Sequence, residues 1–472
     1  MRALPYLLAT LLLAACSSTT PSPDDASGGL TLFRGGSRLK ARVLSGEGGA
    51  KVFQSFSDSA LGTDCAPRQG ADGKLRCLPL VGGDPLFADA ACTLLAARAP
   101  AECEPSKFTA TADSCGKGVE VYEIGAKLEG PKAYRKSNGA CEAFSPDAPL
   151  HATTKVDLAK FAELTTSEVA AGPLTVTQVR SADGAAAVYQ LAITSSKAEC
   201  ALQSLSDVSG EALGCVPAAA SSTPESEFGD AACSEPVAVS YQSEACGARP
   251  AVAQIFAKKG AGECDGYRLE YRALGEPVSA LYAKGGGTCA ALPAPPGAAR
   301  SAYKLGATVD PATFPAVASR SVGSGRLRSR EYTVADKAVG QAQTLLDGEV
   351  ACSPSSFADG VKRCLPGTVR TVTARETQQK FADPACTQPL YEQDLCSAPA
   401  THIAIVEETG CKRSITKVLK AGAKFTGTKF YFSNPGDSAC LPADVSPRSS
   451  LFSAGEEVSP AAAFATVTEA LE

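Results

Sequence analysis

The chain has 472 residues, of which 44% are hydrophobic and 20% charged, and its formal net charge is −5. This mildly acidic balance, with both signs interspersed, argues against a nucleic-acid-binding surface, which needs a basic patch or stripe. The absence of tryptophan and the aromatic content of only 6% weaken the case for sugar binding on aromatic platforms. After the first residues, no hydrophobic segment reaches membrane-spanning length.

The first residues have the layout of a bacterial export signal. Met1 and Arg2 precede an apolar run over residues 3–13 that is too short to span a bilayer as a stable helix. The run ends in Leu13-Ala14-Ala15-Cys16, which resembles the lipobox of bacterial lipoproteins. The resemblance implies that residues 1–15 are a signal peptide, that Cys16 is lipidated, and that the lipid holds the protein on a membrane.

A polar tether follows the predicted lipidation site. Residues 17–29 are rich in Ser, Thr, Pro, Asp and Gly and have little apolar surface to bury, so we expect 16–30 to be a flexible linker. Ser17, not an aspartate, follows Cys16, and the sorting rule for bacterial lipoproteins then favours the outer membrane. The predicted location is therefore the cell envelope, at the outer membrane or cell surface.

The other cysteines form one six-cysteine pattern that is written three times. They are Cys65, Cys77, Cys92, Cys103, Cys115 and Cys141; then Cys200, Cys215, Cys233, Cys246, Cys264 and Cys289; then Cys352, Cys364, Cys386, Cys396, Cys411 and Cys440. An even count in an exported chain is typical of a disulfide framework. Because no Cys-x-x-Cys occurs and the chain has only 2 histidines, we expect no metal site and no cofactor.

Further motifs repeat with the cysteines and divide residues 31–472 into copies at approximately 31–160, 161–313 and 314–472. A Phe-x-Asp motif precedes the third cysteine of each copy, with its aspartates at Asp89, Asp230 and Asp383, and a tyrosine precedes each sixth cysteine, at Tyr134, Tyr282 and Tyr431. We expect the aspartates to accept hydrogen bonds from backbone amides at a turn while the phenylalanines pack in the core. A repeated ligand site is the alternative.

Hairpin geometry predicts that neighbouring cysteines pair in sequence order. Six cysteines allow fifteen connectivities, so this scheme is one of several for each copy. The predicted bridges are Cys65–Cys77, Cys92–Cys103, Cys115–Cys141, Cys200–Cys215, Cys233–Cys246, Cys264–Cys289, Cys352–Cys364, Cys386–Cys396 and Cys411–Cys440. A bridge between copies would contradict the scheme.

Short strands with glycine and proline turns dominate each copy. Residues 118–124 and 188–193 alternate between apolar and polar positions, whereas only 155–164 has a helical apolar period. Asp-Gly pairs such as Asp72-Gly73 and Asp359-Gly360 predict tight turns. Each copy contains about eight strands in two groups of four, so the predicted class is all-β.

The two ends of the chain predict a closed arrangement. The third copy ends with residues 464–468 and lacks the leucine-containing strand that would follow them. The first copy begins with that strand, around Leu39. This circular offset predicts a closed six-bladed β-propeller of three two-blade repeats, in which 464–468 pairs beside 39–43 and no sheet edge is left exposed. Three tandem β-sandwich domains, which need no contact between the termini, are the alternative.

The remaining chemical candidates have structural interpretations. We expect His151 and His402 to be structural or surface residues, and the glycines at 285–287 to form a loop, because no Lys-Ser/Thr follows them. Ser414-Ile415-Thr416-Lys417 matches a string of penicillin-recognising enzymes but lacks its companion motifs. The basic cluster is expected to be a solvated strand face, with an anion site as the alternative; it comprises Arg320, Arg326, Arg328 and Arg330.

No nucleophile–base or metal motif is recognisable, and all the cysteines have other assignments. The favoured hypothesis is a non-catalytic, lipid-anchored binding or scaffold protein with an envelope or extracellular protein as its partner. A propeller enzyme acting on a glycan or ester through carboxylates is one alternative, and a structural envelope protein is another. Carboxylates of raised pKa in a pocket would favour the enzyme, and an apolar or tyrosine-lined rim would favour binding.

Overall fold

The computed structural model describes residues 30–80, 86–98, 106–113, 115, 117–130, 132–137, 140–146, 149–206, 212–222, 226–240, 249–260, 262, 264–285, 288–292, 301–373, 379–394, 396, 398–410, 412–433, 439–446 and 449–472. Within this part of the chain, α1 (Pro460–Ala463) is the only α-helix, and the strands are mostly antiparallel. The predicted all-β class is therefore confirmed.

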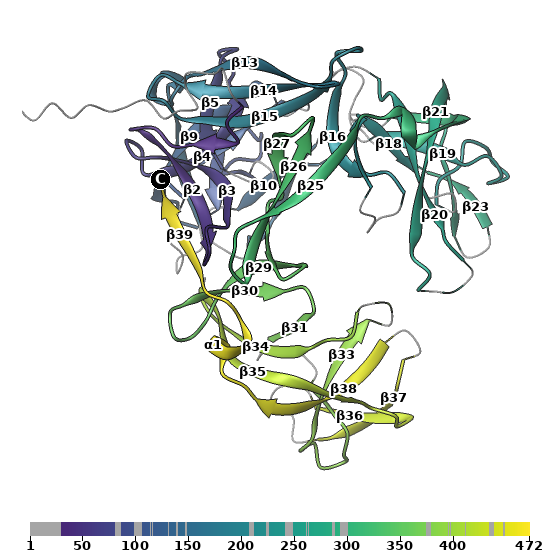
Figure 1. Ribbon diagram of the computed structural model, residues 1–472. Coiled ribbons are helices and arrows are strands. Elements are labelled where there is room, and N and C mark those ends of the chain that lie inside the picture. Colours follow the sequence, from purple (N-terminus) through teal and green to yellow (C-terminus); the bar gives the residue numbers. More distant parts are fainter. Residues whose placement is uncertain are drawn as a thin grey trace, which may run out of the picture.

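Three units with the same strand order form the centre of the molecule, and we call them ring sheets 1, 2 and 3 (Figure 1). Ring sheets 2 and 3 are continuous with each other in one 12-stranded sheet. Ring sheet 1 is β39 (Val467–Leu471), β2 (Leu39–Gly46), β3 (Lys51–Asp58), β4 (Thr63–Gln69) and β5 (Leu75–Pro79). Ring sheet 2 is β13 (Leu164–Ala171), β14 (Leu174–Ser181), β15 (Ala186–Ile193), β16 (Glu199–Ser204) and β17 (Leu213–Pro217). Ring sheet 3 is β25 (Ala316–Val322), β26 (Leu327–Val334), β27 (Lys337–Gln341) with β28 (Leu345–Asp347), β29 (Val350–Ser356) and β30 (Lys362–Pro366).

The last strand of the chain completes the first ring sheet. β39 lies antiparallel beside β2, with Gly46 opposite Val467 and Arg42 opposite Leu471, and Figure 1 shows the yellow β39 next to the purple β2. The predicted pairing of the two ends is confirmed, although the contact lies three residues further along both strands than expected. Tandem sandwich domains, which need no such contact, do not describe this arrangement.

The three ring sheets are also joined edge to edge at equivalent points. The amide of the second cysteine in each sheet donates to the carbonyl that follows a buried phenylalanine: Cys77 to Ala162 at 2.9 Å, Cys215 to Pro315 at 3.0 Å and Cys364 to Ala465 at 2.9 Å. Sheet 1 is thereby joined to sheet 2, sheet 2 to sheet 3, and sheet 3 back to sheet 1. The result is a closed circuit of three sheets.

The hydrophobic core of the ring lies between the sheets rather than inside each one. One cluster joins sheets 1 and 2, a second joins sheets 1 and 3, and a third joins sheets 2 and 3. Leu39, Leu174 and Leu327 occupy the same place in the three clusters, and each is at most 1% exposed. Since each sheet buries its apolar residues against both neighbours, one sheet alone would leave them in water.

The second half of each copy forms a separate lobe. Lobe 1 contains β6 (Leu86–Phe87), β7 (Leu95–Arg98), β8 (Phe108–Thr111), β9 (Glu120–Lys127), β10 (Ala133–Ser137), β11 (Ala140–Phe144) and β12 (Leu150–Lys155). Lobe 2 contains β18 (Ala219–Ser222), β19 (Val237–Ser240), β20 (Val252–Lys258), β21 (Tyr267–Pro277), β22 (Tyr282–Gly285), β23 (Thr288–Ala291) and β24 (Ser301–Val309). Lobe 3 contains β31 (Val369–Thr373), β32 (Gln379–Phe381), β33 (Pro389–Asp394), β34 (His402–Thr409), β35 (Lys412–Lys424), β36 (Lys429–Ser433), β37 (Leu441–Asp444) and β38 (Ser449–Glu457).

The lobes make the prediction of six blades wrong, because they are not four-stranded blades. Lobe 2 is a closed barrel, β18-β19-β24-β21-β20, and lobe 3 is an eight-stranded curved sheet. The pairings β21–β24 and β35–β38 both contain register shifts. Gly306 and Gly455 lie at these crossings, where a Cβ would come within 2.8 and 3.0 Å of a backbone carbonyl of the partner strand. Such shifts and close approaches bend a sheet towards a barrel.

Each lobe packs on the last strand of its own ring sheet. A short turn, η2 (Leu158–Lys160), η4 (Pro311–Thr313) or α1, leads the chain from the lobe to the next ring sheet. The phenylalanine after each turn, Phe161, Phe314 or Phe464, is buried in the cluster that joins lobe and ring. The first ring strands after these turns begin at Leu164 and Ala316, next to the predicted copy boundaries.

Candidate functional site

A cavity of about 450 Å³ opens where the third strands of the three ring sheets come together. Phe53 on β3 comes from ring sheet 1, residues 188–191 on β15 come from ring sheet 2, and residues 339–341 on β27 come from ring sheet 3. We call this cavity the axial pocket, because all three copies contribute equivalent strands to its wall. A pocket in this position depends on the closed ring and could not form in an isolated copy.

The segment that enters the ring from residue 30 provides one wall of the axial pocket. Strand β1 (Phe33–Arg34) pairs with β15, and the amide of Val188 donates to the carbonyl of Leu32 at 3.0 Å. The fully buried Gln178 donates its Nε2 to the carbonyl of Thr31 at 2.6 Å. A buried amide that lost this acceptor would be destabilising, so these bonds hold Leu32 in place in the pocket wall.

Another part of the wall depends on an interruption in ring sheet 3. Its third strand is split into β27 and β28, and Gln343 lies in the gap between them. Nε2 of Gln54 on β3 donates to the carbonyl of Gln343 at 3.2 Å, so ring sheet 1 bonds to this gap. Phe53 stacks on Phe33 with ring centroids 5.5 Å apart and sits against the same region.

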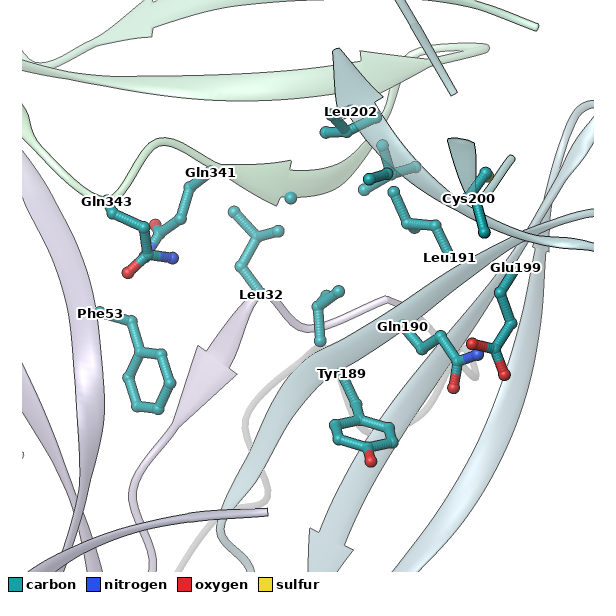
Figure 2. A pocket seen from close by; sticks show the side chains of 15 residues that line it. Leu32, Phe53, Tyr189, Gln190, Leu191, Glu199, Cys200, Leu202, Gln341 and Gln343 are labelled. Atoms are coloured by element: carbon teal, nitrogen blue, oxygen red, sulfur yellow. The ribbon is translucent and has the colours of Figure 1, made fainter. Parts of the chain in front are cut away.

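The lining of the axial pocket is apolar at its base and polar at its rim. Figure 2 shows Leu32, Phe53, Leu191 and Leu202 around the cavity. The side-chain amides belong to Gln190, Gln341 and Gln343, and Tyr189 is 42% exposed. Glu199, on the strand next to Gln190, is the only charged residue of the lining. Amides, a phenol and apolar carbon can bind a ligand by hydrogen bonds and by shape.

The described carboxyl groups whose pKa is shifted all have it shifted in one direction. Within the described ranges, no group of three or more His, Cys, Asp or Glu side chains could hold a metal ion. Where carboxyl groups of the described residues have a shifted pKa, the shift is downward, as for Asp183, Asp359 and Glu469. A general acid at neutral pH needs the opposite shift.

The repeated Phe-x-Asp motif has a structural role in all three copies. Asp89 accepts from the amides of Thr93 and Leu94 at 2.9 and 2.6 Å, and Asp230 and Asp383 make the equivalent bonds. The amide of Leu94 and then the Thr93 hydroxyl lower the pKa of Asp89. Phe228 and Phe381 are buried. The prediction that these aspartates bond backbone amides at a turn is confirmed.

Three of the nine predicted disulfides are confirmed, and all three are hairpin bridges of the ring sheets: Cys65–Cys77, Cys200–Cys215 and Cys352–Cys364. The six predicted in the lobes are wrong, namely Cys92–Cys103, Cys115–Cys141, Cys233–Cys246, Cys264–Cys289, Cys386–Cys396 and Cys411–Cys440. The third cysteine of each copy bonds the sixth instead, as Cys92–Cys141, Cys233–Cys289 and Cys386–Cys440.

Strand pairing explains the third-to-sixth bridges. The motif phenylalanine lies opposite the repeated tyrosine, Phe87 with Tyr134, Phe228 with Tyr282 and Phe381 with Tyr431. The turn after the phenylalanine gives the third cysteine a positive φ of 51–52° and places it beside the sixth. The motif therefore pairs with the far end of its copy, not with the next strand.

One bridge joins two copies, which contradicts the sequential scheme further. Cys264, at the β20–β21 turn of lobe 2, bonds Cys396, after β33 of lobe 3, and the two are 132 residues apart. Cys115 is also disulfide-bonded. Cys103, Cys246 and Cys411, like the predicted lipidation site Cys16, lie outside the described residues.

The two histidines have structural surroundings. His402 on β34 is half-buried, packs edge to face on Phe464 with centroids 5.5 Å apart, and has its pKa lowered by burial and by the charge of Lys420. His151 on β12 hydrogen-bonds the carbonyl of Gly125 through Nδ1 at 3.0 Å.

The basic cluster and the Ser-x-x-Lys string also have partners of their own. Arg320 pairs with Glu331, Arg326 with Asp347, and Arg328 and Arg330 with Glu349. These arginines are therefore paired on an exposed strand face, as the favoured interpretation predicted. Lys417 of the Ser-x-x-Lys string pairs with Glu457 at 3.1 Å.

The axial pocket itself was not predicted from the sequence. Its residues come from three copies and from the segment before β1, so no motif brings them together. The available signals were a tyrosine on an exposed strand position and glutamines in otherwise apolar strands, and neither points to a pocket by itself.

The comparisons with known proteins add a family and no function. Residues 10–432, well over half of the chain, match a family described as a family of unknown function (DUF7481). No curated protein and no solved structure matches the chain. Across the described residues, the helices are all too short and too polar to cross a membrane.

Proposed function

We propose that this chain, which belongs to the DUF7481 family of unknown function, is a lipid-anchored envelope protein that binds a partner protein without catalysis. The axial pocket is its proposed binding site. The anchor is proposed from the Leu13-Ala14-Ala15-Cys16 string, and outer-membrane attachment from Ser17.

The observation that carries the binding proposal is the chemistry of the pocket lining. An apolar base with an amide and tyrosine rim suits an inserted side chain of a partner, because the base takes carbon and the rim takes hydrogen bonds. Phe53 and Leu32 are fixed by stacking and backbone bonds, so little ordering entropy is lost on binding. Among the described lining residues there is no histidine and no group that could hold a metal ion, and for this reason we favour binding over catalysis.

A capture experiment tests the proposed site. The purified protein and the variant Gln343→Arg, which would place a long cationic side chain at the pocket rim, are compared as baits in solubilised envelope extract. Gln69→Arg on β4 is the matched control, because Gln69 is an exposed glutamine outside the pocket. We expect at least one protein to be captured by the wild type and by Gln69→Arg, and to be lost from Gln343→Arg.

Equal capture by all three baits would contradict the pocket as the site. Turnover of an envelope polysaccharide or ester by the purified protein, abolished in Glu199→Gln, would replace the proposal with an enzyme. The anchor is tested separately by mass spectrometry of the N-terminus: a lipidated Cys16 is expected, and an unmodified start elsewhere would contradict it.

A further inference from the structure

Lobes 2 and 3 are built from equivalent strands in the same order around the sheet. β18 runs parallel to β20 in lobe 2, and β31 runs parallel to β34 in lobe 3. From β20, the lobe 2 sheet continues through the antiparallel strands β21 and β24 to β19. From β34, the lobe 3 sheet continues through the antiparallel strands β35 and β38 to β33. The two lobes can therefore be compared strand by strand.

The two lobes differ at the seam between β18 and β19 in lobe 2 and between β31 and β33 in lobe 3. In lobe 2, β18 pairs antiparallel with β19, with Ser221 opposite Val239, and this pairing closes the barrel. In lobe 3, no backbone bond of the described residues links β31 to β33, and β31 ends the sheet. A cavity of about 300 Å³ lies between them, lined by Val369, Arg370 and Thr371 on one side and Gln393, Asp394 and Ala398 on the other.

Local bonding accounts for the open seam. At the end of β33, the side chain of Gln393 bonds the backbone of Ala398 and Ala400, so β33 turns to its own following loop and not to β31.

Within the described residues, no strand pairs with the edge of β31 that faces away from β34. In a parallel pair, alternate residues point their N–H and C=O groups towards the neighbour, and the residues between them point the other way. The residues of β31 that do not bond β34 therefore present donors and acceptors to the cavity. Unpaired strand edges of this kind are templates for an added strand.

We propose that the seam of lobe 3 binds an extended polypeptide segment of a partner, which adds as a strand to the free edge of β31. A strand is the occupant because lobe 2 satisfies the equivalent edge with a strand, β19. Backbone bonds would give the affinity, and Arg370 and Asp394 on opposite walls would select segments that carry charges of both signs. This site lies in lobe 3, apart from the axial pocket, and is independent of the function proposed there.

The test selects ligands for the seam and locates where they bind. A phage-displayed library of random 12-residue peptides is selected on the full immobilised protein, and the enriched peptides are synthesised. Backbone amide hydrogen exchange is then measured with and without each peptide. We expect at least one peptide to slow exchange about tenfold or more in β31, while β18, whose seam is already closed, serves as the internal control and does not change.

A version of the peptide methylated on alternate backbone nitrogens provides the second control. Alternate nitrogens can be methylated in two ways, at the odd or at the even positions of the peptide. If the peptide pairs as a strand, one of these two versions should no longer protect β31 from exchange, and the other should still protect it. Selection of no peptide, or of peptides that protect other segments only, would overturn the proposal. The Gln343→Arg variant should bind the same peptides as the wild type, which separates this site from the axial pocket.

Discussion

The three ring sheets are nearly copies of one another, whereas the three lobes have diverged into different sheets. Every ring sheet has the same strand order, the same hairpin disulfide and a buried leucine at the same place. Lobe 2 is a closed barrel, lobe 3 an open curved sheet, and lobe 1 a seven-stranded sheet. Each ring sheet must fit two neighbours of its own kind, but each lobe packs mainly on one ring strand.

The packing therefore constrains the two regions differently. A change in one ring sheet affects two interfaces and the closure of the ring, whereas a change in a lobe affects little beyond that lobe. Substitutions in the ring should lower the stability of the whole molecule, and substitutions in the lobes should act locally unless they break the bridge between lobes 2 and 3.

Removal of the closing strand is expected to have the largest effect. Deletion of residues 461–472 removes β39 with its backbone bonds to β2 and the buried Phe464 and Val467. We expect the free energy of unfolding to fall by more than about 5 kcal/mol, measured by denaturant titration. Deletion of only residues 471–472 removes the two backbone bonds between Ala41 and Glu472 but leaves Phe464 and Val467 in place, and it should give a smaller loss. An unchanged unfolding midpoint for the longer deletion would mean that the ring sheets are stable without closure.

Loss of the disulfide between lobes 2 and 3 should have the second largest effect on stability. The loop closed by Cys264–Cys396 spans 132 residues, against 12 for the ring hairpin Cys352–Cys364. Chain entropy then predicts a loss of about 5 kcal/mol for Cys264→Ser with Cys396→Ser, and about 3 kcal/mol for Cys352→Ser with Cys364→Ser. Calorimetry of both double variants checks the order. A larger effect of the hairpin pair would show that native packing in the ring outweighs loop length.

A single leucine at the ring interface should have a smaller but still large effect. Leu327→Ala leaves a cavity between ring sheets 1 and 3 and should lower the free energy of unfolding by about 2–5 kcal/mol. Leu441→Ala on β37 of lobe 3 changes the same side chain where it is 46% exposed, and should stay within about 0.5 kcal/mol of wild type. Similar losses in both variants would contradict the difference between ring and lobe.

The smallest effect concerns acid stability. The Arg363 guanidinium, and then the amide of Val361, lower the pKa of Asp359 to about 2, from the ordinary value of 3.8. A lowered folded-state pKa adds stability above the ordinary value, and this stability is lost as the pH falls from about 4 to about 2. Asp359→Asn should therefore flatten the pH dependence of the unfolding midpoint over that range. A curve parallel to wild type would mean that Asp359 makes the same bonds in the unfolded chain.

Local sequence was sufficient to predict a contact wherever the residues that make it are close together in the chain. The hairpin disulfides and the aspartate turns were predicted correctly because each involves strands joined by a short connection. The pairing of the chain ends was also predicted, but from the offset between copies, which is information about repeats and not about local propensity. The lobe disulfides failed because the Phe-x-Asp segment pairs with a strand near the end of its copy.

The sequence by itself determined the class of structure, the three copies and the need for closure, because strand periodicity and repeated motifs are properties of the chain alone. Only the tertiary structure decided how many sheets form the ring, that lobe 2 closes and lobe 3 does not, and that residues of all three copies meet in the axial pocket. Those outcomes depend on which strand edges meet. Such contacts join residues far apart in the chain, and the hydrophobic pattern of the sequence does not determine them.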